Sequence, residues 1–287
     1  MSPFQFPSPL VGPGSQPLEP DGAELDYLPM PRGMATYQPP RLPEPEEAGA
    51  YPAGVAVLEC LLAALETYRP GEAPVELDLS ALPAADRDMI DQTLGEGEVA
   101  VRMADQPELR VFETRLAGIW RIRSLATAGA AAIDRLEVAD IPALVRARAF
   151  AGAAERTHAD PGAALPPGLM NAPGVLVELA AQAPTWRPGD LPYVVNLTLL
   201  PQTPEDLAYL DQRLGRGPVA ILSHGYGSCR IVSTGLARCW WVQHYNADER
   251  LILNTLEIAD VPAAALAARE DIEDSAGRLR EILEVLR

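Results

Sequence analysis

The chain reads Asp91-Gln-Thr-Leu-Gly-Glu-Gly-Glu-Val-Ala-Val101 at one point and Asp211-Gln-Arg-Leu-Gly-Arg-Gly-Pro-Val-Ala-Ile221 further on, two stretches of nearly the same residues in the same order. A second pair repeats at the same offset of 120 positions, Leu136-Glu-Val-Ala-Asp-Ile-Pro-Ala143 and Leu256-Glu-Ile-Ala-Asp-Val-Pro-Ala263. So many matches in one register indicate a tandem duplication of a unit of about 100 residues, a period far too long for a solenoid repeat.

Both copies predict the same order of elements. Each opens with a helix (Val55–Tyr68; Val175–Ala183) and a β-rich run (Val75–Leu79; Tyr193–Leu199), followed by a short helix (Pro83–Leu94; Pro204–Leu214) that ends at Gly95 or Gly215. Strands follow at about 98–103, 109–115, 118–124 and 132–138, and again at 218–223, 229–234, 238–245 and 251–258. Further helix starts are predicted at Asp140-Ile-Pro and Asp260-Val-Pro, with a longer amphipathic helix at the C-terminus. We therefore expect an α+β fold in which each module is an antiparallel sheet with helices packed on one face.

The predicted boundaries are an arm at 1–50, a first, diverged copy at 51–151, a linker at 152–172 and a second copy at 173–287. Proline recurs throughout the arm, and it removes backbone donors and disfavours helix, so we expect a disordered, Pro-rich segment. Four larger apolar or aromatic side chains cluster within it: Tyr27, Met30, Met34 and Tyr37. They are candidates for contact with a partner, and the alternative is that they pack on the protein's own domain.

Composition restricts the class of partner. The 287 residues carry 23 Lys+Arg against 40 Asp+Glu, a net charge of -17. Binding of nucleic acid and of anionic membrane surfaces depends on Lys and Arg, so neither is expected. The sequence has no apolar run of bilayer-spanning length, no secretory signal and no disulfide framework among Cys60, Cys229 and Cys239, which predicts a cytoplasmic protein. Catalytic, metal and cofactor motifs are also missing from it, so we expect no enzyme, no metal site and no cofactor.

One turn distinguishes the copies. The second copy has Ser223-His-Gly-Tyr-Gly-Ser-Cys-Arg230 where the first has Arg102-Met-Ala-Asp-Gln-Pro-Glu-Leu-Arg110. Glycine lets the backbone adopt positive φ or approach another group closely. The candidate partner-binding residues in this turn are His224, Gly225, Tyr226, Gly227, Cys229 and Arg230. The alternative is a glycine-adapted hairpin in which Cys229 is a small buried apolar side chain.

A second contrast sets Trp241 against Arg121. Strand alternation places Trp120 and Trp240 toward the core and these two residues on the opposite face. A position that accepts arginine is predicted to be open to solvent, so Trp241 needs a cover, either the other copy or a partner.

At these residues the chain resembles the HupH/HyaF/HoxQ family of [NiFe]-hydrogenase expression/formation proteins. The resemblance is carried by Gly215-Arg-Gly-Pro-Val-Ala-Ile-Leu-Ser-His-Gly-Tyr-Gly-Ser-Cys-Arg-Ile231, Trp240-Trp-Val-Gln-His-Tyr-Asn246, Ile252-Leu-Asn-Thr-Leu-Glu-Ile-Ala-Asp-Val-Pro262 and Glu270-Asp-Ile-Glu-Asp-Ser-Ala-Gly-Arg-Leu279, with Tyr27-Leu-Pro-Met-Pro-Arg-Gly-Met34 and Pro39-Pro-Arg-Leu-Pro43 in the arm. The family commonly has arginine where this chain has His224, so His224 is not expected to be essential.

The resemblance implies a cytoplasmic maturation accessory protein, or chaperone, that binds the iron–sulfur small-subunit precursor, with other maturation proteins as further partners. Two chemical alternatives stay open. One is a metal- or cluster-handling protein using Cys229, Cys239 and His224 or His244, although the cysteines are ten positions apart and no short ligand pair is present. The other is a thiol-based redox enzyme with Cys229 as its nucleophile.

Overall fold

The computed structural model describes residues 49–125, 132–155, 165–225 and 227–286. Nearly the whole predicted arm, with Tyr27, Met30, Met34 and Tyr37, lies outside these ranges, as do Tyr226 and the middle of the predicted linker.

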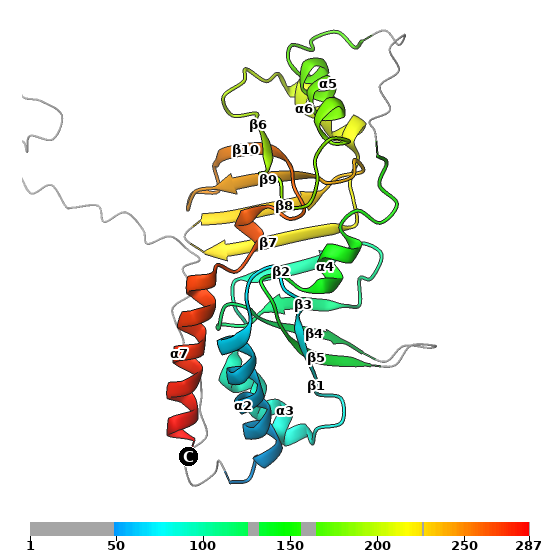
Figure 1. Ribbon diagram of the computed structural model, residues 1–287. Helices are drawn as coiled ribbons and strands as arrows, with labels where there is room; N and C mark the ends of the chain where they lie inside the picture. The colour runs from blue at the N-terminus through cyan, green and yellow to red at the C-terminus, as the bar shows by residue number, and fades with distance from the viewer. Residues whose placement is uncertain (1–48, 126–131, 156–164, 226, 287) are drawn as a thin grey trace, which may run out of the picture. The chain divides into compact units, whose positions relative to one another are not determined.

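The two copies contain matching elements (Figure 1). The first comprises α2 (Pro52–Thr67), β1 (Val75–Asp78), α3 (Ala84–Leu94), β2 (Val99–Met103), β3 (Arg110–Glu113), β4 (Ile119–Ser124), β5 (Ile133–Val138) and α4 (Ala143–Arg148). The second comprises α5 (Ala172–Gln182), β6 (Tyr193–Asn196), α6 (Pro204–Leu214), β7 (Val219–Gly225), β8 (Gly227–Ser233), β9 (Cys239–Tyr245), β10 (Leu251–Ile258), a 3-10 turn at Ala263–Ala265 and α7 (Arg269–Val285). The predicted helices and strands are thus present, except that the start at Asp260-Val-Pro yields only the 3-10 turn.

The ten strands of the described residues form one antiparallel sheet in the order β1-β5-β4-β3-β2-β7-β8-β9-β10-β6. The expected two sheets are therefore two halves of one, joined where β2 lies beside β7 (Figure 1). At this junction Val101 pairs with Ile221, its own counterpart in the repeat, and the pairs Val99–Ser223 and Met103–Val219 flank it symmetrically. This register places an approximate twofold axis at the Val101–Ile221 pair.

The two Gly-x-Gly elements occupy equivalent turns. Gly95 and Gly215 end α3 and α6 with φ of 61° and 64°. A Cβ on Gly97 would lie 2.4 Å from the carbonyl oxygen of Thr114, and one on Gly217 would lie 2.4 Å from Ser233 Oγ. Glycine is needed at Gly97 and Gly217 because the backbone there approaches the neighbouring strand closely.

A pair of helices covers one face of each half of the sheet. In both pairs, the two helices are joined by the same kind of hydrogen bond. In the first copy, the backbone N–H of Gly54 on α2 donates to Asp86 Oδ1 on α3 at 2.8 Å. In the second, Asp206 on α6 accepts from the backbone N–H groups of Asn171 and Ala172 at 3.2 and 3.0 Å, where α5 begins. A buried aspartate therefore ties the paired helices together in both copies.

The opposite face of the sheet holds the paired tryptophans in equivalent environments. Trp120 Nε1 donates to the carbonyl oxygen of Ala139 at 3.0 Å, and Trp240 Nε1 donates to that of Asp260 at 3.1 Å. Phe150, from the segment after α4 of the first copy, packs edge-on against Trp240 with ring centroids 5.1 Å apart. The first copy's end therefore helps to cover the second copy.

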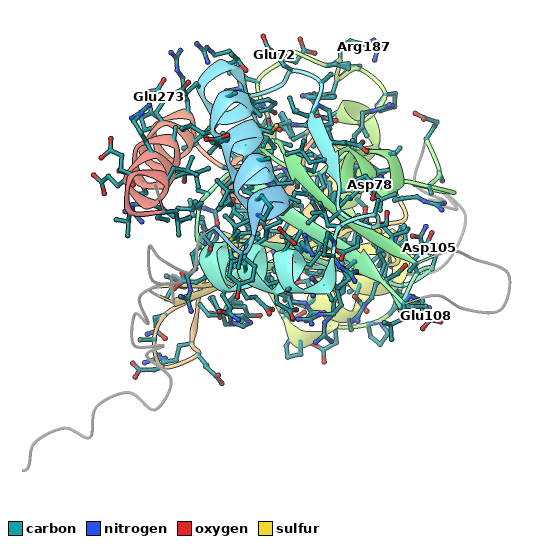
Figure 2. The ribbon with its side chains drawn as sticks, turned by 90° about the horizontal axis from the view of Figure 1, so that it is seen from below. Glu72, Asp78, Asp105, Glu108, Arg187 and Glu273 are labelled. Atoms are coloured by element: carbon teal, nitrogen blue, oxygen red, sulfur yellow. The ribbon has the colours of Figure 1, made fainter. Side chains whose placement is uncertain are left out.

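The C-terminal helix α7 makes the reciprocal contact. It packs beside α2 of the first copy (Figures 1 and 2). Its side chains Ile272, Leu279 and Leu283 are buried in the core that also contains the apolar face of α2, and Arg280 pairs with Glu66 at 2.7 Å. Each copy thus supplies a segment that covers the other.

Candidate functional site

The β7–β8 hairpin carries the turn that differs between the copies. Both strands run to its tip, where Gly225 pairs with Gly227, whereas in the first copy β2 ends at Met103. Gly227 has a φ of 107°, and a Cβ there would lie 2.4 Å from the carbonyl oxygen of Tyr245 on β9. Glycine is therefore required at position 227 for two reasons: the backbone has a positive φ, and it approaches β9 closely.

His224 lies on the exposed part of this hairpin. Its backbone N–H donates to the carbonyl oxygen of Glu98 at 2.9 Å, so this hydrogen bond joins the hairpin to the first copy. Neither its imidazole nor Cys229 lies within a cluster of three or more potential metal ligands, and the described ranges contain no such cluster anywhere.

The thiol of Cys229 is partly buried. Its Sγ lies 3.8 Å from His244 Nε2 and packs against the main core. Burial, with a smaller effect from the carboxylate of Glu257, raises the pKa of Cys229 to about 11. A thiol with such a pKa is protonated near neutral pH, and protonated sulfur is a poor nucleophile.

Cys239 is separated from Cys229 by the sheet itself. Cys229 shares a face with its strand partner His244, whereas Cys239, an odd number of residues from His244 on β9, points to the other face. Cys239 is fully buried in the α5–α6 core, and burial raises its pKa to about 12. Two cysteines on opposite faces of a sheet cannot hold one metal ion, and Cys60, the third, lies exposed on α2.

Arg121 and Trp241 occupy equivalent positions with different surroundings. The prediction of a solvent-open position is wrong for Arg121, which is 1% exposed because α3 covers that face of β4. Its guanidinium pairs with Asp134 at 2.6 Å and with Asp91 of α3 at 3.3 Å. Trp241 donates instead from Nε1 to Asn254 Oδ1 at 2.6 Å, Asn254 being the counterpart of Asp134.

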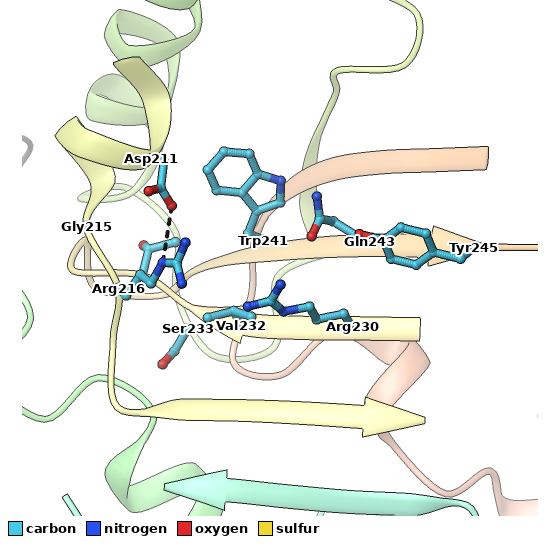
Figure 3. A pocket seen from close by; sticks show the side chains of 10 residues that line it. Asp211, Gly215, Arg216, Arg230, Val232, Ser233, Trp241, Gln243 and Tyr245 are labelled. Carbon is cyan, nitrogen blue, oxygen red and sulfur yellow. Dashed lines mark hydrogen bonds and ion pairs between the residues drawn. The ribbon is translucent and has the colours of Figure 1, made fainter. Parts of the chain in front are cut away.

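Trp241 is partly covered by its own copy. It packs against the α5–α6 core rather than against the first copy, and its remaining surface lines a pocket of about 280 Å³. The pocket lies between the end of α6 and the strands β8 and β9 (Figure 3). Its lining includes Asp211, Arg216, Arg230, Val232, Trp241, Gln243 and Tyr245.

The structure brings only some of the predicted site residues together. Arg230 and Trp241 share the pocket, while Cys229 faces the other side of the sheet. The other eight residues of the lining were not predicted from the sequence, and four of them carry larger polar or charged side chains: Asp211, Arg216, Gln243 and Tyr245. The sequence does show that Arg216 replaces Glu96 at the repeat offset. The consequence of that replacement depends on which side chains the sheet places near Arg216.

The fold and the site define an internally duplicated α+β protein with a polar, partly aromatic pocket in its second copy. None of the described helices combines the length and apolar character that crossing a bilayer requires. A family model described as HupH hydrogenase expression protein, C-terminal conserved region, matches the chain twice, at residues 52–158 and 169–286. The same model thus recognises both copies.

Whole-length relatives agree with this match. The chain is 49% identical to the hydrogenase expression/formation protein HupQ of Azotobacter chroococcum, over 97% of this chain and 96% of the relative. It is 42% identical to HoxQ of Cupriavidus necator, over 99% and 98%, and 44% identical to HupH of Rhodobacter capsulatus, over 100% of both chains. The chain belongs to the HupH family of hydrogenase expression/formation proteins.

Proposed function

We propose that this chain is a cytoplasmic accessory protein of [NiFe]-hydrogenase maturation that binds the iron–sulfur small-subunit precursor before assembly and export, without turnover. Family membership across both copies supports the hydrogenase context. The observation that carries binding over catalysis is the state of Cys229, whose raised pKa of about 11 leaves little thiolate for nucleophilic chemistry.

Surface charge supports a partner with basic segments. The net charge is -17, and the labelled carboxylates Glu72, Asp78, Asp105, Glu108 and Glu273 lie on the outside of the described chain (Figure 2). Such a surface attracts cationic segments at long range and accelerates encounter with them. An arginine-bearing signal peptide on the small-subunit precursor has the complementary charge.

Affinity purification tests the proposal directly. The tagged full-length chain is recovered from cells that make either the complete small-subunit precursor or the same subunit without its signal peptide. We expect the precursor to co-purify, with less recovered when the signal peptide is removed and at raised ionic strength. Recovery of no small subunit in either strain, from cells in which it is produced, contradicts the proposal.

The β7–β8 hairpin is the proposed contact region, and a paired variant tests it. His224→Ala together with Tyr226→Ala should reduce recovery of the precursor. The matched control, Gln106→Ala together with Glu108→Ala, alters the corresponding turn of the first copy and should leave recovery unchanged. Equal recovery with both double variants would show that the hairpin is only a turn.

Cys229→Ser separates binding from the two chemical alternatives. Serine preserves the size of the side chain but cannot supply a thiolate. We expect the variant to capture the precursor and to support hydrogenase formation as the unmodified protein does. Loss of hydrogenase formation with normal folding, or iron or zinc bound stoichiometrically to the unmodified protein and lost in the variant, would favour the thiol or metal alternative.

A further inference from the structure

The pocket in the second copy contains Arg230, and the residues that contact the equivalent arginine of the first copy are replaced in the second copy. In the first copy, Arg110 pairs with Glu96 at 3.1 Å and lies over the ring of Phe112 at 5.3 Å. At the repeat offset, Arg230 replaces Arg110, Arg216 replaces Glu96, and Val232 replaces Phe112. One substitution removes the carboxylate that paired with the arginine, and the other removes the ring beneath it.

The guanidinium of Arg230 accordingly has no carboxylate partner within the described part of the chain. It lines the pocket on β8, next to Val232 (Figure 3). Val232 has a smaller side chain than its counterpart Phe112, which is buried in the first copy. Arginine presents a planar set of donors that matches a carboxylate or a phosphate in a bidentate geometry.

The other charges of the pocket leave one positive charge uncompensated. Arg216 pairs with Asp211 at 3.3 Å. The counterpart of Asp211 in the first copy, Asp91, instead pairs with Arg121 and Arg123, which are Trp241 and Gln243 in the second copy. The pocket therefore holds two guanidinium groups and one carboxylate.

The remaining walls favour a carboxylate attached to an apolar group. The indole of Trp241 is fixed by its bond to Asn254, and Trp241 and Tyr245 line the pocket from β9. A single uncompensated cation matches a monoanion, whereas a phosphate dianion beside Asp211 would require further cations. The aromatic wall suits the aliphatic or aromatic part of a peptide.

We propose that this pocket binds a carboxylate carried next to an apolar group, with Arg230 as its cation and Trp241 as its apolar wall. The same chemistry is supplied by an acidic side chain of a partner polypeptide and by a free small carboxylic acid. The first copy cannot bind this group at the equivalent place, because Glu96 and Phe112 already satisfy Arg110.

The indole N–H resonance of Trp241 provides a local reporter in the full-length protein. The tryptophan indole signals are recorded with ¹⁵N labelling, and that of Trp241 is identified from its loss in Trp241→Phe. The probes are acetyl-Ala-Glu-Phe-amide, its neutral counterpart acetyl-Ala-Gln-Phe-amide, and N-acetylphenylalanine as a free carboxylate. We expect a saturable shift with a carboxylate probe at millimolar concentration and binding at least about tenfold weaker with the Gln peptide.

Variants that restore first-copy residues provide the controls. Arg216→Glu gives Arg230 an internal carboxylate, and Val232→Phe refills the space, so each should weaken binding of the carboxylate probe by at least about tenfold, as should Arg230→Gln. Arg110→Gln in the first copy should leave the binding unchanged. Because Arg216 and Arg230 are exposed, their variants should keep the thermal midpoint of the unmodified protein.

The outcomes are distinct. Tighter binding of the Glu peptide assigns the site to an acidic segment of a partner, and tighter binding of N-acetylphenylalanine assigns it to a free carboxylate, both in agreement with the proposal. Absence of a saturable shift with both carboxylate probes, equal shifts with the Glu and Gln peptides, or equal losses in Arg110→Gln and Arg230→Gln would overturn it. None of these measurements requires a hydrogenase subunit, so the result is independent of the proposed function.

Discussion

At the scale of single residues, comparison of the two copies gave a wrong prediction for Arg121, the counterpart of Trp241. It is an arginine buried in the sheet face that holds Trp241 in the other copy, and its charge is balanced by Asp134 and Asp91. Alternation along β4 predicts the face to which Arg121 points, but not that α3 lies over that face. A buried guanidinium is tolerated because the two carboxylates offset part of its desolvation.

Replacing Arg121 by Met should therefore be strongly destabilising. The change leaves the buried carboxylate of Asp134 with only the longer pairs to Arg87 and Arg123, both at 3.4 Å. We expect the free energy of unfolding to fall by about 3 kcal/mol. Chemical denaturation measures it, with Arg110→Gln as the control, because an exposed ion pair contributes less than about 1 kcal/mol. Equal stability of the two variants would mean that Asp134 does not need Arg121.

Glu113 predicts a dependence of stability on pH. Burial raises its pKa from 4.5 to about 7, opposed by the N–H of Gly118 and reinforced by Asp271 of α7. Between these values the folded protein keeps a proton that the unfolded chain releases, so stability should fall as pH rises from about 4.5 to about 7. Above this window both states are ionised and the loss is complete.

The variant Glu113→Gln keeps an acceptor for the N–H of Gly118 but does not ionise. The free energy of unfolding, measured across the window, should fall less with rising pH in this variant than in the unmodified protein. Other groups titrate equally in both proteins, so the difference between the two curves reports Glu113. Parallel curves would show that Glu113 ionises normally in the folded state.

At the scale of the elements, the duplicated sequence predicted most helices and strands because each signal occurs twice. Gly95 and Gly215 end equivalent helices, and the aligned tryptophans lie in equivalent strands. The joining of β2 to β7 was not predictable in the same way, since hydrophobic periodicity identifies a strand but not its neighbour. The pocket depends on the pairing of β8 with β9 and on the end of α6, so sequence contrasts identified Trp241 and Arg230 without showing that they line the same pocket.

Two glycines on different elements give a matched prediction. Gly227 has positive φ and no room for a Cβ, so Gly227→Ala should distort the β7–β8 hairpin and lower the free energy of unfolding by about 2 kcal/mol. Gly277 lies inside α7, where a Cβ would meet nothing within 4 Å, so Gly277→Ala should raise it by about 0.5–1 kcal/mol. Denaturant midpoints measure both, and the same sign for the two variants would contradict the prediction.

At the scale of the whole described chain, the two copies depend on each other although they arose as repeats. The sheet is continuous through β2 and β7, α7 packs beside α2, and Phe150 packs on Trp240. We propose that the boundaries at 51–151 and 173–287 divide the sequence into repeats but do not divide the protein into units that fold separately.

Expression of the two halves tests this interdependence. A fragment of residues 49–155 lacks α7, so the apolar surface of α2 and one edge of β2 become exposed, and a fragment of residues 165–287 exposes the edge of β7 and the apolar face of α7. Exposed strand edges and apolar helix faces promote association. We expect each fragment alone to be aggregated or largely unfolded, and the mixed fragments to form a one-to-one complex that recovers the native circular dichroism spectrum.

The variant Leu279→Ala refines this test in the full-length chain. Leu279 is fully buried, and its truncation should lower the free energy of unfolding by about 3 kcal/mol. Because its side chain lies in the core shared with α2, amide exchange should accelerate in α2 of the first copy as well as in α7, while α5 and α6, which pack in a separate core, change less. Faster exchange confined to the second copy, or a fragment of residues 49–155 that is monomeric and cooperatively folded, would show that the repeats are independent domains.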